Sequence, residues 1–240
     1  MSPARRFALR ATAALALFGW AATAFAVEPF VAQYDVLRGG RTLGAATMQV
    51  TSTAPSRWRI DLTMRGGGLL RLAGISAEQS TVFETDGETY RPLSQSTVRG
   101  HVFTRRQTTG VYDWPARQAQ WRGDIRKDRQ APVPLQPGDM SGLLINLAVI
   151  RDAQPGRQLD YRFVDDGRVR LHRYVVAEQT EPVRVGDMGF DALRVTRLQD
   201  GGDETVIWVV ADVPTPVRLL QRENGQDTYD LRLTEYKGVP

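Results

Sequence analysis

Residues Glu204–Tyr236 read ETVIWVVADVPTPVRLLQRENGQDTYDLRLTEY, and this stretch predicts three successive β-strands. The first strand is the β-branched and aromatic run 205–210, which suits a pleated surface. Two prolines follow, and because proline cannot donate to a strand ladder, the chain must turn there. A second strand over 217–223 leads through the dipeptide Asn-Gly, which is favoured in tight hairpins, to a third strand over 226–236.

The same alternation of apolar and polar residues recurs along the rest of the chain, most clearly over Trp58–Arg65. Separate strands are expected at Val169–Glu178 and at Val183–Val185. One helix is expected at Met140–Ile150 with Asp139 as its N-cap, and apolar residues surround most of it, so other elements should cover it. The sequence therefore predicts a mainly β fold: an antiparallel barrel-like or half-open barrel, or a sandwich, of about a dozen strands with one internal helix.

The N-terminus has the features of a secretory signal peptide. Three arginines precede a short apolar run, which ends in the small-x-small pattern of Ala24 and Ala26. We predict a cleaved signal peptide at residues 1–26, a single β-rich domain at 27–240, and a periplasmic location. The apolar run is shorter than the roughly 20 residues that cross a bilayer, so no membrane span is expected after cleavage.

Charge and composition argue against several classes of function. Loss of the three arginines lowers the formal net charge from +4 to +1, and a nearly neutral chain has no global attraction for nucleic acid. The chain has no cysteine, which excludes disulfides and thiol chemistry. We therefore expect no nucleic-acid partner.

No pattern of residues predicts catalysis. His101 and His172 are the only histidines, and without cysteine they do not predict a metal site or a cofactor. Gly138–Gly142 is misspaced for a serine nucleophile elbow, and helix capping explains Ser141 more simply. The acidic run Asp200–Glu204 is expected to be a solvated turn, since it lacks the spacing of a calcium loop. We expect no catalytic residues and a protein that is not an enzyme.

Aromatic and aliphatic residues instead favour an apolar cavity, because antiparallel barrels often enclose one. The candidate ligand-binding residues are Trp58, Leu62, Leu144, Leu147 and Trp208. The alternative for all five is ordinary core packing, which explains most buried tryptophans.

Several short motifs occur in an order that resembles a known family. They are Tyr34-Asp35-Val36 followed by Gly44, then Tyr112-Asp113-Trp114, then Gly138-Asp139-Met140-Ser141, then Ile207-Trp208 with Pro216-Val217-Arg218. Together they resemble the secreted bacterial domain-of-unknown-function family 3108, which has no assigned activity. The segment from Trp208 to Tyr236 also resembles the closing strands of periplasmic lipoprotein carriers. That likeness implies a half-open β-barrel with a helix at its mouth and a cavity for acyl chains.

Three hypotheses about function follow. The first is a periplasmic, non-catalytic protein that binds a lipid or another amphiphilic ligand of the cell envelope. The second is a structural module that binds envelope proteins through its edge strands or through the loop Leu69–Ile75. The third is an enzyme acting on cell-wall glycan, which requires convergent carboxylates.

Overall fold

The structure is a computed structural model of the 240-residue chain. It describes residues 27–68, 76–86, 88–101, 104–199, 201 and 203–238. The predicted signal peptide at 1–26 and the loop Leu69–Ile75 lie outside the described residues.

All the strands of the described chain belong to one sheet of fifteen strands, in the order β8-β7-β6-β5-β4-β3-β2-β1-β15-β14-β13-β12-β11-β10-β9. Neighbouring strands are antiparallel except β9 and β10, which are parallel. The first half of the chain forms β1 (Phe30–Arg38), β2 (Arg41–Ala54), β3 (Arg57–Gly66), β4 (Ser76–Thr85), β5 (Tyr90–His101), β6 (Thr104–Asp113), β7 (Gln118–Gly123), the 3₁₀ turn η1 (Lys127–Arg129) and β8 (Val133–Pro134). The second half forms β9 (Asp139–Met140), the helix α2 (Gly142–Asp152), β10 (Gln158–Asp165), β11 (Arg168–Val185), β12 (Met188–Leu198), β13 (Glu204–Val209), β14 (Arg218–Glu223) and β15 (Gln226–Gly238).

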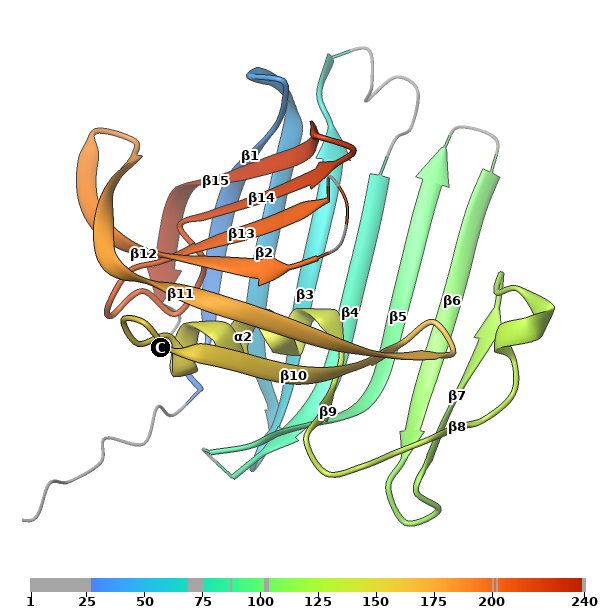
Figure 1. Ribbon diagram of the computed structural model, residues 1–240. Helices are drawn as coiled ribbons and strands as arrows, with labels where there is room; N and C mark the ends of the chain where they lie inside the picture. Colours follow the sequence, from blue (N-terminus) through green and yellow to red (C-terminus); the bar gives the residue numbers. More distant parts are fainter. Residues whose placement is uncertain are drawn as a thin grey trace, which may run out of the picture.

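The sheet curls around α2, so that β1–β7 form one wall and β10–β15 the other (Figure 1). The helix contacts β3, β4, β5 and β10. The short strands β8 and β9 are the two edges and do not pair with each other, so the barrel is half open. The prediction of a mainly β, barrel-like fold with an internal helix is confirmed, with fifteen strands in place of about a dozen.

The face of the sheet that packs on α2, which we call the inner face, forms the core. Strand residues alternate between the two faces, and the large inner side chains of both walls pack on the helix in one cluster. Its most buried members include Phe30, Met48, Ile60, Leu144 and Leu231. A smaller cluster around Tyr112, Trp121 and Val164 lies between β6–β7 and β10. The expected covering of the helix is therefore confirmed.

Two local predictions were wrong. The helix begins at Gly142, and its N-cap is Ser141, whose Oγ accepts from the Leu144 N–H at 3.5 Å. This confirms capping as the explanation of Ser141. Asp139 is not the cap: it lies fully buried in β9 and accepts hydrogen bonds from the Arg162 guanidinium at 2.6 Å and the Gln136 N–H at 2.8 Å. Both oxygens of the Asp139 carboxylate are held by charge-assisted hydrogen bonds from Arg162, so they do not accept from the helix N–H groups.

The second correction concerns β11, which is one strand where two were expected, at 169–178 and at 183–185. The pairing of β11 with β12 shifts register between Val176 and Thr180 and then continues to Val185. Such irregularities bend a strand without ending it, so a break in the sequence pattern did not mark the end of the strand.

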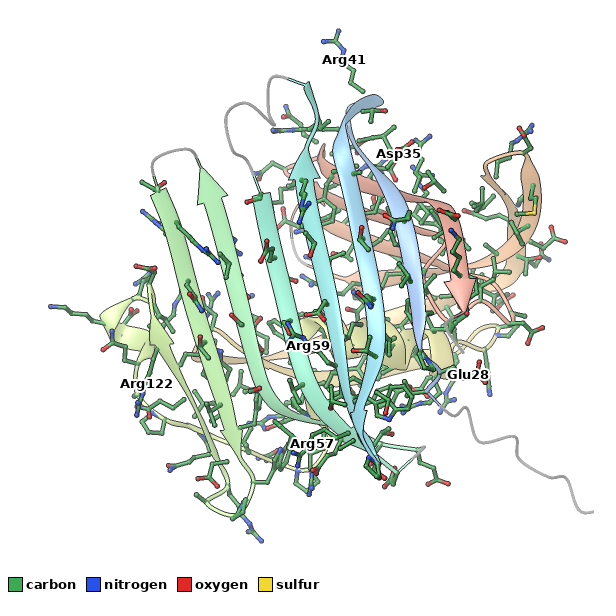
Figure 2. All side chains as sticks on the ribbon, turned by 180° about the vertical axis from the view of Figure 1, so that it is seen from behind. Glu28, Asp35, Arg41, Arg57, Arg59 and Arg122 are labelled. Carbon is green, nitrogen blue, oxygen red and sulfur yellow. The ribbon has the colours of Figure 1, made fainter. Side chains whose placement is uncertain are left out.

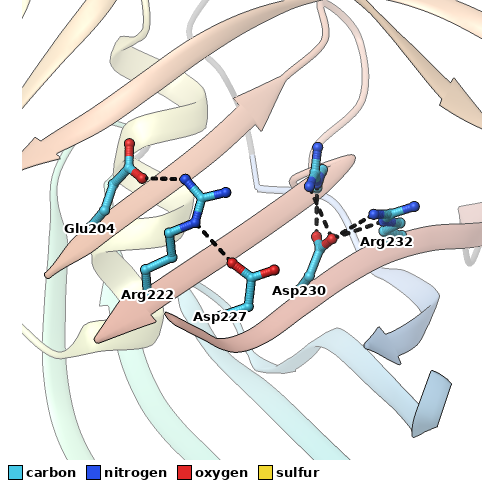
Figure 3. A network of polar contacts seen from close by, with 6 residues as sticks. Glu204, Arg222, Asp227, Asp230 and Arg232 are labelled. Atoms are coloured by element: carbon cyan, nitrogen blue, oxygen red, sulfur yellow. Dashed lines mark hydrogen bonds and ion pairs between the residues drawn. The ribbon is translucent and has the colours of Figure 1, made fainter. Parts of the chain in front are cut away.

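Charged and polar side chains occupy much of the outer face of each wall, although Val206, Trp208 and Leu220 are buried apolar residues on the outer face of β13 and β14. Figure 2 looks onto the outer face of β1–β7, from which Asp35 and Arg59 project. On the opposite wall, Figure 3 shows Arg222 between Glu204 and Asp227, and Arg232 beside Asp230.

Asp230 is the buried member of this network, with a side chain only 4% exposed. Burial opposes its charge, but hydrogen bonds from Arg218 and Arg232 hold the pKa of Asp230 below its ordinary value. The three strands of this network, β13, β14 and β15, confirm the prediction for the stretch from Glu204 to Tyr236.

Candidate ligand-binding hollow

The five residues that the sequence singled out all belong to the main core or pack against it. Leu62, Leu144 and Leu147 are buried, and Trp58 is partly buried against the same cluster. Leu147 also lines a small hollow of about 40 Å³. Whether these side chains contact a ligand stays a prediction.

Trp208 lies apart from the other four, on the opposite face of its strand from the inward Ile207. The guanidinium of Arg218 lies 4.5 Å from the centre of its ring, and its Nε1 donates a hydrogen bond to Glu181. The structure therefore does not bring Trp208 to the inner face with Leu62.

Strand register shows how the inner face changes from apolar to polar across the first wall. One row of cross-strand partners runs from β1 to β6 through Ala32, Met48, Leu62, Gln79, Thr97 and Thr108. The next row runs through Tyr34, Ala46, Met64, Ala77, Arg99 and Arg106. Both rows are apolar on β1–β3 and end on polar or cationic side chains on β5 and β6.

A hollow of about 250 Å³ lies where this second row changes from apolar to cationic side chains. We call it the apolar hollow and define it by the side chains of Val36, Leu43, Met64 and Ala77, which are all partly exposed. Gly44 and Gly66, which are cross-strand partners, also line it. Arg99 lies at its edge.

A second, polar pocket of about 140 Å³ lies on the same face at the start of α2. Its lining includes Gln79 and Thr97 of the first row, so it lies one row from the apolar hollow. Hydrogen bonds cross it from wall to wall. Thr81 Oγ1 lies 3.0 Å from Ser141 Oγ, and Gln95 donates to Asp165. These contacts hold β4 and β5 against the segment containing β9 and β10.

Tyr112 extends this connection between the walls, since its hydroxyl lies 2.6 Å from Gln95 Oε1 and 2.7 Å from the Val164 carbonyl oxygen. Burial raises the pKa of the neighbouring Asp165 to about 6. Nearby, the ring of Phe163 stacks on His172 at 4.4 Å between centroids. Burial, and then Arg197 and Arg170, lower the pKa of His172 to about 4, so this imidazole is neutral at pH 7.

The pKa of Asp165 predicts a measurable pH dependence. An acid whose pKa is higher in the folded chain binds its proton more tightly there, so the free energy of unfolding should fall as pH rises from about 4 to about 6. Asp165→Asn should remove this dependence and be about 1–3 kcal/mol more stable than the parent at pH 7. Chemical denaturation of both proteins at pH 4.5 and pH 7 measures it.

His172 contributes in the opposite direction over part of the same range, because its pKa is lowered from 6.5 to about 4. The parent protein alone therefore does not isolate the carboxyl group. The difference between the parent and Asp165→Asn does, since His172 is present in both. An equal difference at the two pH values would contradict the prediction.

A third hollow, of about 470 Å³, lies on the outer face of β2–β6 and is lined mainly by hydroxyl, amide and charged side chains. Arg59 and Asp61 form an ion pair of 2.9 Å within it. Among the described residues, no group of three His, Asp or Glu side chains is placed to hold a metal ion. In the same part of the chain, no helix is long and apolar enough to cross a membrane.

Sequence reasoning missed the residues that form the polar end of the inner face, Gln95, Arg99, Arg106, Tyr112 and Asp165. The strands β5 and β6 are polar on both faces, so periodicity does not show which face is inside. A usable signal was present nevertheless: a strand that is polar on both faces inside a barrel-like fold must carry polar groups inward.

A solved structure shows the same type of fold. A beta-barrel-like protein of the domain of unknown function DUF1849 from Brucella abortus superimposes with a TM-score of 0.54 at 11% identity, over 89% of this chain and 99% of that chain. A DUF1089 family protein from Pseudomonas aeruginosa gives a TM-score of 0.39 at 9% identity, over 74% of this chain and 89% of that chain.

No curated protein sequence matches this chain. The family described as "Protein of unknown function (DUF3108)" matches residues 33–232, which is most of the chain and includes every motif that suggested it. The chain therefore belongs to the DUF3108 family.

Proposed function

We propose that this chain is an exported, non-catalytic binding protein of the cell envelope, which holds the apolar part of an amphiphilic ligand in the apolar hollow. The observation that carries the proposal is the partly exposed set of Val36, Leu43, Met64 and Ala77 around about 250 Å³ of space. Contact between water and these apolar side chains is unfavourable. An acyl chain that displaces this water is therefore stabilised by the burial of apolar surface on both sides.

The polar neighbours of the hollow suit an amphiphile better than a plain hydrocarbon. Typical small-molecule sites enclose about 300–1,000 Å³ and combine an apolar lining with a few polar groups. The apolar hollow, at about 250 Å³, is slightly smaller than that range, and Gln79, Thr97 and Arg99 continue the same face beyond it. The ligand would therefore place its chain in the hollow and its head on β5 and β6.

Export to the periplasm is part of the proposal and is supported by the sequence of residues 1–26. The likeness of the segment from Trp208 to Tyr236 to the closing strands of lipoprotein carriers supports the same class of ligand. Expression of the full chain with and without residues 2–26, followed by cell fractionation, tests the location. Release of only the full chain's product on osmotic shock is the expected result.

Filling the hollow tests the binding. Ala77→Trp places a large ring on the inner face between Met64 and Arg99, and we expect it to weaken binding of a fluorescent fatty acid at least tenfold. Fluorescence titration of the purified protein measures the affinity. Thr63→Trp is the matched control, because Thr63 lies next to Met64 on the outer face.

Thr63→Trp should bind like the parent. Equal affinity of the parent and Ala77→Trp, or no binding by the parent, would contradict the proposal. Circular dichroism of each variant checks that the fold is retained.

The alternative is an envelope interaction module, and one observation favours it. Leu171 of β11 and Leu198 of β12 are 60% and 51% exposed, and they lie diagonally across a strand pair on the outer face. Native mass spectrometry of protein purified gently from periplasm separates the two functions. A small mass lost on denaturation supports the ligand, whereas a co-purified protein supports the module.

A further inference from the structure

The polar end of the inner face carries two arginines directly opposite each other. Arg99 of β5 and Arg106 of β6 are cross-strand partners, and both are exposed. Like charges in this position are destabilising. Among the described residues, no carboxylate lies within 4.0 Å of either guanidinium, so their repulsion is not offset by an ion pair.

The surroundings of the two arginines are neutral or weakly acidic. Cross-strand neighbours in the adjacent row are Thr97 and Thr108. Asp165 lies on the opposite wall, where burial raises the pKa of its carboxyl group and the charge of Arg99 partly opposes that rise. The Asp165 carboxylate accepts its side-chain hydrogen bond from Gln95, not from Arg99.

The arginine pair adjoins the apolar hollow on one continuous face. Arg99 is the cross-strand partner of Ala77, which lines the hollow, and neighbouring strands are about 4.8 Å apart. Guanidinium groups present a fork of donors that matches the oxygens of a carboxylate or a phosphate. An anion between them would remove the repulsion and gain charge-assisted hydrogen bonds from both.

We propose that the ligand's head group is anionic, a carboxylate or a phosphate, and that Arg99 and Arg106 hold it together while its chain occupies the apolar hollow. This inference rests on the proposed function and adds the chemistry of the head group. The arginines thereby select among amphiphiles that share the same chain.

Four ligands with the same twelve-carbon chain test the selection: dodecanoate, dodecyl phosphate, dodecyl maltoside and dodecyltrimethylammonium. Each competes with a fluorescent fatty acid for the purified protein, below its critical micelle concentration and at low salt. We expect one or both anionic ligands to bind about 10- to 100-fold more tightly than the maltoside, and the cationic ligand to bind most weakly. Dodecanoate and dodecyl phosphate distinguish the two sources of negative charge.

Charge reversal locates the selection. Arg99→Glu and Arg106→Glu should each abolish the preference for anions while dodecyl maltoside still binds. Arg105→Glu is the matched control, since Arg105 is also exposed and lies next to Arg106, but pairs with Gly100 on the outer face. It should keep the preference.

The outcomes separate the two proposals. Binding of all four ligands with equal affinity would overturn the anionic head group and leave the apolar hollow supported. No binding of any ligand would overturn both. Loss of the anion preference in Arg105→Glu to the same degree as in Arg106→Glu would show that net charge, and not this pair, attracts the ligand.

Discussion

Replacing Asp139 by alanine is expected to lower the free energy of unfolding by about 3–5 kcal/mol, the usual cost of removing one member of a buried ion pair. Asp139 is fully buried, and both of its carboxylate oxygens lie 2.6 Å from Arg162 Nη1. The substitution leaves the guanidinium, which is 24% exposed, without its partner. It also leaves the Gln136 N–H without its acceptor. Urea denaturation followed by tryptophan fluorescence measures the change.

Asp160→Ala provides the control for this prediction. Asp160 of β10 pairs with Arg173 of β11 at 3.1 Å, but both side chains are more than half exposed. Exposed pairs contribute about 0–1 kcal/mol, so this variant should unfold almost like the parent. Similar losses in the two variants would show that burial does not set the strength of the Asp139 pair.

Replacing Gly44 by alanine is expected to lower the free energy of unfolding by about 3 kcal/mol, at the upper end of the range for overpacking. A Cβ at this position would lie 2.1 Å from the carbonyl oxygen of Arg65. Because that atom belongs to the backbone, no side-chain rotation can relieve the contact, and β2 or β3 must move. Thermal and urea denaturation measure the effect, and the fatty-acid titration reports whether the adjoining hollow changes.

Gly189→Ala is the matched control, since Gly189 also lies in a strand and a Cβ there would have open space around it. We expect a change within about 0.5 kcal/mol. If Gly189→Ala destabilised the protein as much as Gly44→Ala, general strand propensity and not the close contact would explain both.

Local patterns in the sequence were enough to predict most of the long elements. The proline pair and the Asn-Gly dipeptide between Glu204 and Tyr236 placed β13, β14 and β15 within two residues of their bounds. Turns and periodicity depend on neighbouring residues, so they can be read from the sequence. The role of Asp139 could not, because its partner Arg162 is 23 residues away and reaches it only through the parallel pairing of β9 with β10.

The candidate site shows a different kind of limit. Large apolar residues such as Leu62 and Leu144 can be predicted to lie inside, and they are buried, but large side chains fill space. The apolar hollow occurs beside Gly44, Gly66 and Ala77, where residues are small. Hydrophobicity therefore predicts where the core is, whereas a cavity depends on the register that brings small residues together across several strands.

The strand order also determines when the sheet can be completed during folding. Every pair of neighbours in the sheet is consecutive in the chain except β1 and β15. Each half can therefore assemble from short-range contacts, and only the pairing of Phe30 with Gly238 and its neighbours closes a loop of nearly the whole described chain. Long loops are entropically costly to close, and pairings between distant residues form slowly. Joining the two meanders at β1 and β15 is therefore the step that should limit the folding rate, and until then both strands remain open edges that another chain can occupy.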